Sequence, residues 1–398
     1  MEHSSHPRSG PCAGLKVLDL STMVSGPMCG QMFGDLGADV IKLESVEGDQ
    51  LRHTPPQHKG LSAYFCQFNR NKRSIAVDLK SEAGRSIART LASDCDVLVE
   101  NFRPGVSARL GMDYETLRAA NPGLVYVSIK GFGEDGPDKD LPAYDPVIQA
   151  LVGFMPVQGD GGAPQPILNS VVDKLAAMSG VTSALAALWS RERTGGNGQK
   201  VIVKMVDVWA AFISHEEIRD HFFMDAEVPP RPKSGTHRMY KARDGYVMAL
   251  VFQDSQLQGM AKVLKRPDLL SDARFARLRD RVNNLNAMGE ELARSIETMS
   301  VGELVAGARQ HDVPLAKVHS LKEFLDHPQA KHNNTFPITT DPEFGRLKGL
   351  TSFAEFCGSP LDLQARAPRL GEQSDEILAE AGFGLDDIRR LRESGTVR

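Results

Sequence analysis

Residues 15–43 read LKVLDLSTMVSGPMCGQMFGDLGADVIKL, and this stretch decides the fold. Residues 15–20 and 39–43 are short runs of the kind that form buried strands. Between them, Pro27 suits the first turn of a helix that we expect to run to Leu36, because the N–H that proline lacks would be unsatisfied there anyway. A strand, a helix and a second strand in this order predict two parallel strands joined by a crossover helix.

The same alternation continues through the first half of the chain. We expect further strands at 74–79, 97–100, 124–129 and 201–206. We expect helices at 81–92 and 174–193, and a third that ends near Arg219. The predicted fold class is therefore α/β, with an open, largely parallel sheet and helices on both of its faces.

A proline-rich segment, VPPRP at 228–232, predicts a linker and a second domain. Beyond it we expect a smaller α+β domain with a strand at 245–252, helices at 256–264, 284–298 and 301–310, and a returning segment at 313–318. Helices at 374–381 and 385–393 are expected to rejoin the first domain. The predicted ranges are 12–212 and 331–398 for the large domain, 234–310 for the small domain, and 213–233 and 311–330 for the linkers.

Composition excludes several classes of protein. The 398 residues carry a formal net charge of −4, which disfavours nucleic acid as a partner. The five cysteines share no CxxC spacing and predict reduced, intracellular thiols. We expect no apolar run of membrane-spanning length and no signal peptide in the polar residues 1–10. These features predict a cytoplasmic protein without a membrane partner.

Asp173 lies just before the expected helix at 174–193, which is rich in small side chains. One interpretation is an N-cap, since aspartate is common there. The other is a nucleophile, because the positive end of a helix keeps a carboxylate ionised. The two roles are compatible. We also expect backbone N–H groups at the start of this helix to stabilise oxyanions.

Basic and amide side chains follow the expected strand at 97–100. Residues 101–105 read NFRPG, and Arg109 lies shortly beyond. Ligands of open α/β sheets collect at the carboxyl ends of strands, so Arg109 could bind a phosphate there. The alternative is a solvated loop arginine. Lys72, Arg73 and Lys80 flank the strand at 74–79 and are expected to extend the same basic rim.

Other motifs predict no further chemistry. GFGEDG at 131–136 matches the glycine pattern of dinucleotide sites, but PDKDLP follows it and cannot start the required helix, so we expect a loop and disfavour a nicotinamide dehydrogenase. His215 begins HEE, yet the second histidine of a zinc site would have to stand at Arg219. We expect no metal site. The chain also has no GxSxG, which disfavours a serine hydrolase.

Several motifs, in order along nearly the whole chain, resemble the family III CoA-transferases of the carnitine and bile-acid-inducible type. They are GLKVLDL (14–20), SGP (25–27), LGADVIKLE (36–44), NKRSI (71–75), VENFRPG (99–105), GGNGQ (195–199) and PRLGE (368–372). The resemblance implies a Rossmann-like large domain made from both chain ends, a small domain, and an interlocked homodimer.

The resemblance also implies roles for individual residues. Asp173 takes the place of the family's nucleophile. The substrates implied are coenzyme A as an acyl-CoA thioester and a small carboxylic acid, with no tightly bound cofactor. The residues that would contact CoA are Val24, Ser25, Val77, Asp78, Leu79, Lys80, Asn101, Phe102, Arg103, Arg109, Leu141, Pro142, Ala143 and Tyr144.

Two other functions are weighed against transfer. The related α-methylacyl-CoA racemases have a histidine and a glutamate where this chain has Tyr144 and Lys241, so two-sided proton transfer lacks its partners here. A non-catalytic CoA-binding protein would need Asp173 to be only a cap. The glycine-rich small-domain loop of the oxalate-type enzymes is also missing, which disfavours formyl-CoA:oxalate exchange.

Basic residues open the small domain: Arg231, Lys233, His237, Arg238 and Lys241. Arg238 could hold the second carboxylate of a dicarboxylic acceptor such as succinate. The alternative is a solvated basic linker.

Overall fold

The computed structural model describes residues 9–159, 162–227 and 237–398. Their contacts form two compact units, one from the described residues of Met1–Glu217 and Asn334–Arg398 and the other from those of Ile218–Asn333. The expected linker at 228–232 lies outside the described residues. The predicted ranges of the domains and linkers stay a prediction.

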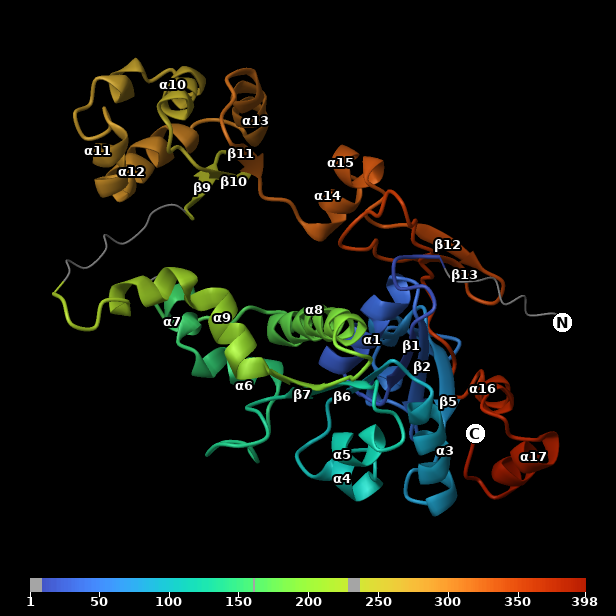
Figure 1. Ribbon diagram of the computed structural model, residues 1–398. Helices are drawn as coiled ribbons and strands as arrows, with labels where there is room; N and C mark the ends of the chain where they lie inside the picture. Colours follow the sequence, from blue (N-terminus) through green and yellow to red (C-terminus); the bar gives the residue numbers. More distant parts are fainter. Residues whose placement is uncertain (1–8, 160–161, 228–236) are drawn as a thin grey trace. The chain divides into compact units, whose positions relative to one another are not determined.

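A six-stranded parallel sheet forms the centre of the first unit (Figure 1), in the order β5-β2-β1-β6-β7-β8. The expected α/β fold with a largely parallel sheet is confirmed. The strands are β1 (Lys16–Asp19), β2 (Asp39–Glu44), β5 (Arg73–Ala76), β6 (Val97–Glu100), β7 (Val125–Lys130) and β8 (Lys200–Lys204).

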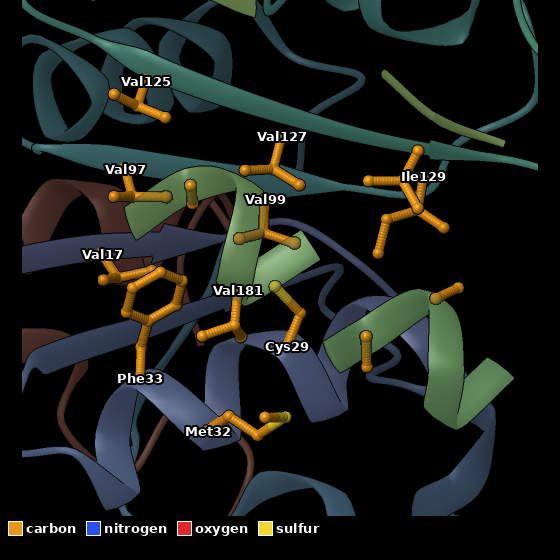
Figure 2. Packing of buried hydrophobic residues seen from close by; sticks show 14 of the residues in the cluster. Val17, Cys29, Met32, Phe33, Val97, Val99, Val125, Val127, Ile129 and Val181 are labelled. Carbon is orange, nitrogen blue, oxygen red and sulfur yellow. The ribbon is translucent and has the colours of Figure 1, made fainter. Parts of the chain in front are cut away.

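Side chains that alternate along each strand bury both faces of the sheet. Val17 packs in one apolar cluster with residues of α1 (Ser25–Asp35) and α8 (Val171–Arg193). Its neighbour Leu18 points to the opposite face, in a second cluster with residues of α3 (Glu82–Ser93), α16 (Ser374–Glu380) and α17 (Leu385–Glu393). Figure 2 shows the first cluster, where valines from several strands face α1 and α8. Burial on both faces explains why the strands are almost wholly apolar.

The strand order reverses between β1 and β6. From β1 the chain proceeds through α1 to β2 on one side, whereas β6 leads to β7 on the other. In open α/β sheets the loops that leave such a pair diverge and open a crevice at the carboxyl ends of the strands. The segments 20–24 and 101–105 begin at this point.

Element boundaries differ from the expected ones where tertiary contacts decide them. The strand expected at 74–79 ends at Ala76, because Val77 pairs in antiparallel fashion with Val397 near the end of the chain. The first helix begins at Ser25, so Pro27 is its third residue. Elements without a strong sequence pattern were not expected: α2 (Ala63–Asn69), α4 (Val106–Leu110), α5 (Tyr114–Arg118), α6 (Asp145–Leu151), α7 (Phe154–Gln158), α14 (Leu321–Leu325), α15 (Pro328–His332) and the hairpin β12 (Ile338–Asp341)–β13 (Gly345–Lys348), with the short strands β3 (Gln57–His58) and β4 (Leu61–Ser62).

Helix α8 is long and apolar enough, by length and composition alone, to cross a membrane. The expectation that no segment reaches that length is therefore wrong. The buried side chains of α8, among them Val172, Val181 and Leu188, belong to the apolar cluster that joins it to α1 and the sheet. This packing is that of the core helix of a folded domain.

The second unit is a three-stranded antiparallel sheet with helices packed on it. The strand order is β11-β10-β9, with β9 (Met239–Ala242), β10 (Gly245–Ala249) and β11 (Leu315–Lys317). Its helices include α10 (Asp254–Val263), α11 (Leu278–Asn283), α12 (Leu285–Ile296) and α13 (Val301–Gln310), and α9 (Met205–Glu217) precedes the unit. The strand β9 was not expected, although alternate residues of its four are buried, because four residues are too few to show this period in the sequence.

A cluster of buried charges lies under residues 21–24. Lys72 Nζ lies 2.7 Å from Asp19 Oδ2, and Lys42 Nζ lies 3.3 Å from Asp49 Oδ2, with all four side chains fully buried or nearly so. Lys42 also donates to the carbonyl of Ser21, and Lys72 to that of Pro27. These contacts tie the segment between β1 and α1 to the sheet.

The opposite charges of this cluster keep one another ionised. Burial lowers the pKa of Lys72 to about 8. Burial also opposes ionisation of Asp19, but the charges of Lys72 and Lys42 outweigh it and hold the pKa of Asp19 below its ordinary value. The Lys72 ammonium has four oxygen acceptors within 3.0 Å, so the pair is ionised at neutral pH. The expected basic rim is wrong for Lys72, which is buried, and for Arg73, which pairs with Asp39, Glu376 and Glu380.

Lys72→Met is expected to lower the free energy of unfolding by about 3–5 kcal/mol, because it leaves Asp19 buried without its partner. Urea unfolding followed by tryptophan fluorescence measures this. The matched control is Lys16→Met, which removes a pair with Asp94 whose side chains are 55% and 77% exposed. That change is expected to cost about 0–1 kcal/mol. Equal effects of the two substitutions would contradict the importance of the buried pair.

Candidate active site

A cavity of about 520 Å³ opens in the first unit at the carboxyl ends of β1, β6 and β7. It brings together segments that are far apart in the sequence, namely 22–25, 101–104, 141–146 and the start of α8. Ten of the predicted site residues line it: Val24, Ser25, Asn101, Phe102, Arg103, Leu141, Pro142, Ala143, Tyr144 and Asp173.

The other predicted site residues do not line this cavity. Val77 is fully buried beside the chain end, and Asp78, Leu79 and Lys80 follow it toward α3. Arg109 is exposed on the short helix α4. Within the part of the chain that the structure describes, no hydrogen bond or ion pair engages its guanidinium. A role for these five residues in binding CoA stays a prediction.

Asn101 joins the two loops that diverge at the reversal of strand order. Its Oδ1 accepts a hydrogen bond from Thr22 N at 2.9 Å, and its Nδ2 donates to Thr22 O at 2.8 Å. Nδ2 also donates to the Ser25 hydroxyl at 3.4 Å. The amide therefore pins the loop after β1 to the end of β6.

A buried ion pair holds the next residues of the second loop. Lys130 Nζ lies 2.9 Å from both carboxylate oxygens of Glu100, which is 1% exposed. Lys130 also donates to the carbonyl of Phe102 at 2.6 Å, and the backbone N–H of Phe102 donates to Glu100 at 2.8 Å. The backbone N–H and C=O groups of Phe102 are thus both bound, and this fixes the loop at 101–104.

Asp173 lies in the first turn of α8, and it is not the N-cap. The N-cap is Ser170, whose side chain makes no capping hydrogen bond. Asp145, at the start of α6, takes over this function because its Oδ2 accepts from the backbone N–H groups of Val172 at 2.7 Å and Asp173 at 3.0 Å. The interpretation of Asp173 as a cap is therefore wrong, and its carboxylate is free to face the cavity.

The expected oxyanion donors at the start of α8 are already occupied. Besides the two N–H groups bound to Asp145, that of Val171 donates to Asn169 O and that of Lys174 to Ser170 O. All four N–H groups of the first turn have acceptors within the protein. The expectation that they stabilise oxyanions is wrong in this structure.

The electrostatics of the cavity raise the pKa of Asp173 to about 6. Burial is the largest cause, and the neighbouring charge of Asp145 adds to it. A hydrogen bond from the Ser25 hydroxyl and the charge of Lys174 act in the opposite direction. A carboxylate with such a pKa is more basic than an ordinary aspartate and still ionised at neutral pH.

Sequence reasoning pointed to the acidic stretch from Asp145 to Asp173 but gave Asp145 no role of its own, and it missed Gln149 and Lys130. Gln149 donates to Asp145 Oδ1 at 2.5 Å and accepts from the N–H of Ile167 at 2.9 Å, so it links α6 to the segment before α8. Asp145 carried one usable signal, an aspartate followed by proline at a helix start. The N–H groups that it binds on α8 belong to Val172 and Asp173, which lie 27 and 28 residues away. No local pattern reveals so distant a contact.

The glycine motif at 131–136 forms a loop after β7, as expected. Gly131 is required there because a Cβ would lie 2.1 Å from the Cβ of Ala143. This close approach brings the segment 141–144 against the end of β7. His215 lies within α9, and the residues that the structure describes contain no group of three or more side chains suited to a metal ion.

The sequence model of the family described as CoA-transferase family III matches residues 12–374. The chain belongs to CoA-transferase family III. The resemblance in the sequence motifs is thereby confirmed. As a family III CoA-transferase it is an enzyme whose class acts on CoA thioesters and carboxylic acids.

Relatives of this family III CoA-transferase differ in their substrates. The succinate–glutarate CoA-transferase of Agrobacterium fabrum is 30% identical over 96% of this chain and 98% of that protein. The formyl-CoA:oxalate CoA-transferase of Streptomyces coelicolor is 33% identical, with 96% and 98% covered. The crystal structure of a CaiB/BaiF family protein from Brucella suis is 32% identical, with a TM-score of 0.81, and covers 94% of this chain and 100% of that one.

The activity of the transferase is expected to fall below about pH 6, because Asp173 acts only when it is ionised and its pKa is raised to about 6. Asp145→Asn removes the nearby negative charge but keeps an oxygen acceptor. It should therefore lower the pKa of Asp173 and move the acid limb of kcat/KM to lower pH. The control is Glu115→Gln, since the Glu115 side chain is 76% exposed on α5. An acid limb that stays in place in Asp145→Asn would contradict this coupling.

Proposed function

We propose that this enzyme moves CoA from an acyl-CoA thioester to a small carboxylic acid, with Asp173 as the covalent nucleophile. The observation that carries the proposal is the Asp173 carboxylate in the wall of the cavity. It is relieved of capping α8 by Asp145, and its pKa is raised to about 6. A basic, partly desolvated carboxylate is suited to attack a carbonyl carbon.

The proposed reaction is an exchange through anhydrides. Asp173 attacks the thioester carbonyl carbon, so a C–O bond forms, the C–S bond breaks and CoA leaves as the thiolate. The thiolate then attacks the Asp173 carbonyl carbon, giving an aspartyl-CoA thioester and releasing the first acid as its carboxylate. The acceptor carboxylate displaces CoA through a second anhydride, and the thiolate attacks the acceptor carbonyl, which regenerates Asp173. No net charge or proton is consumed.

The charges of the cavity wall support binding of an anionic substrate. Arg103 and Lys139 line the cavity, and neither forms an ion pair within the described ranges. Lys130 is neutralised by Glu100. The predicted contacts of Arg109 and of residues 77–80 would place the nucleotide end of CoA outside the cavity, where Arg109 is exposed.

Asp173→Asn is expected to lower the exchange rate by at least about 10³-fold while the melting temperature stays near that of the wild type, because an amide cannot form the anhydride. Mass spectrometry after incubation with succinyl-CoA should find a covalent adduct on the peptide that contains Asp173. The matched control is Asp207→Asn, because the Asp207 side chain is 69% exposed on α9. Retained exchange in Asp173→Asn, or an adduct on another residue, would contradict the assignment.

The same adduct tests the acceptor, which we propose to be a small dicarboxylic acid. Similar enzymes are named for succinate, glutarate and mesaconate, and Arg103 and Lys139 could hold a second carboxylate. Succinate and glutarate should release CoA from the adduct faster than butyrate and valerate do. Faster release by bulky monocarboxylates would refute this.

Arg238 lies in the second unit and packs along α12, where its Nη1 approaches Asn286 O at 3.5 Å. Its part in binding the acceptor stays a prediction, which Arg238→Ala in the same assay tests against Arg103→Ala.

We also propose that two chains form the interlocked homodimer that the family resemblance implies. Apolar side chains on α8 and α9 support this, since Trp189 is 65% and Phe212 is 59% exposed in the single chain. Sedimentation velocity should give a dimer that persists on dilution. A fully active monomer would refute the proposal.

A further inference from the structure

The side chain of Ser25 has a position that binding of CoA does not explain. Ser25 is the first residue of α1, is 4% exposed, and lines the same cavity as Asp173. The Ser25 hydroxyl also neighbours Asn101, whose Nδ2 lies 3.4 Å from Ser25 Oγ. A hydroxyl between an amide and a carboxylate needs a defined direction for its proton.

The hydrogen bonds of Asn101 set this direction. The backbone N–H of Thr22 can only donate, so the atom of Asn101 that faces it must be Oδ1. The amide nitrogen therefore faces Thr22 O and Ser25 Oγ. Since Asn101 donates to Ser25 Oγ, the Ser25 proton is left for another acceptor, and the Asp173 carboxylate, which lines the same cavity, offers one.

Close packing holds the three groups in place. Gly26 follows Ser25 in α1, and a Cβ at Gly26 would lie 2.2 Å from the Cβ of Ser21 and 3.4 Å from Cγ of Asn101. The backbone N–H and hydroxyl of Ser21 both donate to Asp19 in the buried charge cluster. The start of α1 is therefore fixed against both Asn101 and the residues below it.

We propose that Ser25 and Asn101 are positioning residues for Asp173, in which Asn101 orients the Ser25 hydroxyl and this hydroxyl donates to one carboxylate oxygen of Asp173. The other oxygen then faces the thioester. The inference rests on the proposed role of Asp173 as the nucleophile. In this role the two side chains orient the nucleophile itself, which residues that only contact CoA would not do.

The same hydroxyl serves the later steps. When the CoA thiolate attacks the aspartyl carbonyl carbon, negative charge develops on the oxygen of Asp173 that accepts from Ser25. The N–H groups of the first turn of α8 cannot serve this oxyanion, because all four already have acceptors. Ser25 thus supplies an oxyanion donor that α8 does not.

Other charged groups also act on Asp173, namely Asp145 from α6 and Lys174 from α8 itself. The other charged and titratable groups in the cavity wall are Arg103, Lys130, Lys139, Tyr64 and Tyr144. None of them is changed by a substitution at Ser25 or Asn101. A shift in the pH profile of these variants therefore reports on the hydrogen bond.

The experiment compares Ser25→Ala, Ser25→Thr and Asn101→Ala in the full-length enzyme, with Ser86→Ala on the exposed face of α3 as the control. Steady-state kinetics over about pH 4.5–8.5, a range that spans the Asp173 titration, give kcat and KM for succinyl-CoA. Thermal melting confirms the fold of each variant.

Ser25→Ala is expected to lower kcat by about 10²-fold and to move the acid limb to higher pH, because the carboxylate loses a donor and its pKa rises. Asn101→Ala should shift both in the same direction by less. Ser25→Thr keeps the hydroxyl and should recover most of kcat. A raised KM with unchanged kcat and acid limb in Ser25→Ala would overturn the inference and leave Ser25 as a CoA contact. That result would leave the proposed function intact if the adduct on Asp173 still forms, whereas absence of the adduct in the wild type would refute the function itself.

Discussion

Two lysines and two aspartates lie under the segment between β1 and α1 with almost no access to water. Placing such ions in the interior costs several kcal/mol each, and good geometry must offset this. An apolar cluster of the same size would be at least as stable. It would not, however, donate to the carbonyls of Ser21 and Pro27 as Lys42 and Lys72 do. The charges therefore hold one backbone path, in which Met23 has a positive φ of 67° and Ser25 reaches the cavity.

The reversal of strand order brings this fixed segment together with others at one edge of the sheet, and together they form the site. Parallel strands end at one edge of a sheet, so the segments after β1, β6 and β7 meet there although they are distant in the sequence. The first two are each fixed by a buried ion pair: the segment after β1 by Asp19 and Lys72, and that after β6 by Glu100 and Lys130. Asn101 then links the first two. Asp173 enters from α8, which packs on α1 in the same apolar cluster.

Local pattern predicted the strands and helices of the sheet well because each carries its own periodicity. The strand at 97–100 and the helices at 301–310 and 385–393 have the expected bounds. Pattern failed where a distant partner decides the structure, as when Val397 ends β5 or Asp145 caps α8. The motifs placed ten residues at the cavity and named Asp173. They could not show that Lys72 is buried or that Asn101 binds Ser25 Oγ, since both facts depend on side chains from other elements.

The pairing of Val77 with Val397 has a consequence for synthesis of the chain. One face of the sheet is covered in part by Ile377, Leu378 and Ile388, which leave the ribosome after the whole second unit. During that interval the six strands of the sheet are complete and α3 already packs on this face, but the apolar residues that α16 and α17 will cover are still exposed. Apolar surface that is exposed for such an interval favours aggregation of the nascent chain. A unit built from segments on both sides of another unit is thus completed only after that other unit has been synthesised.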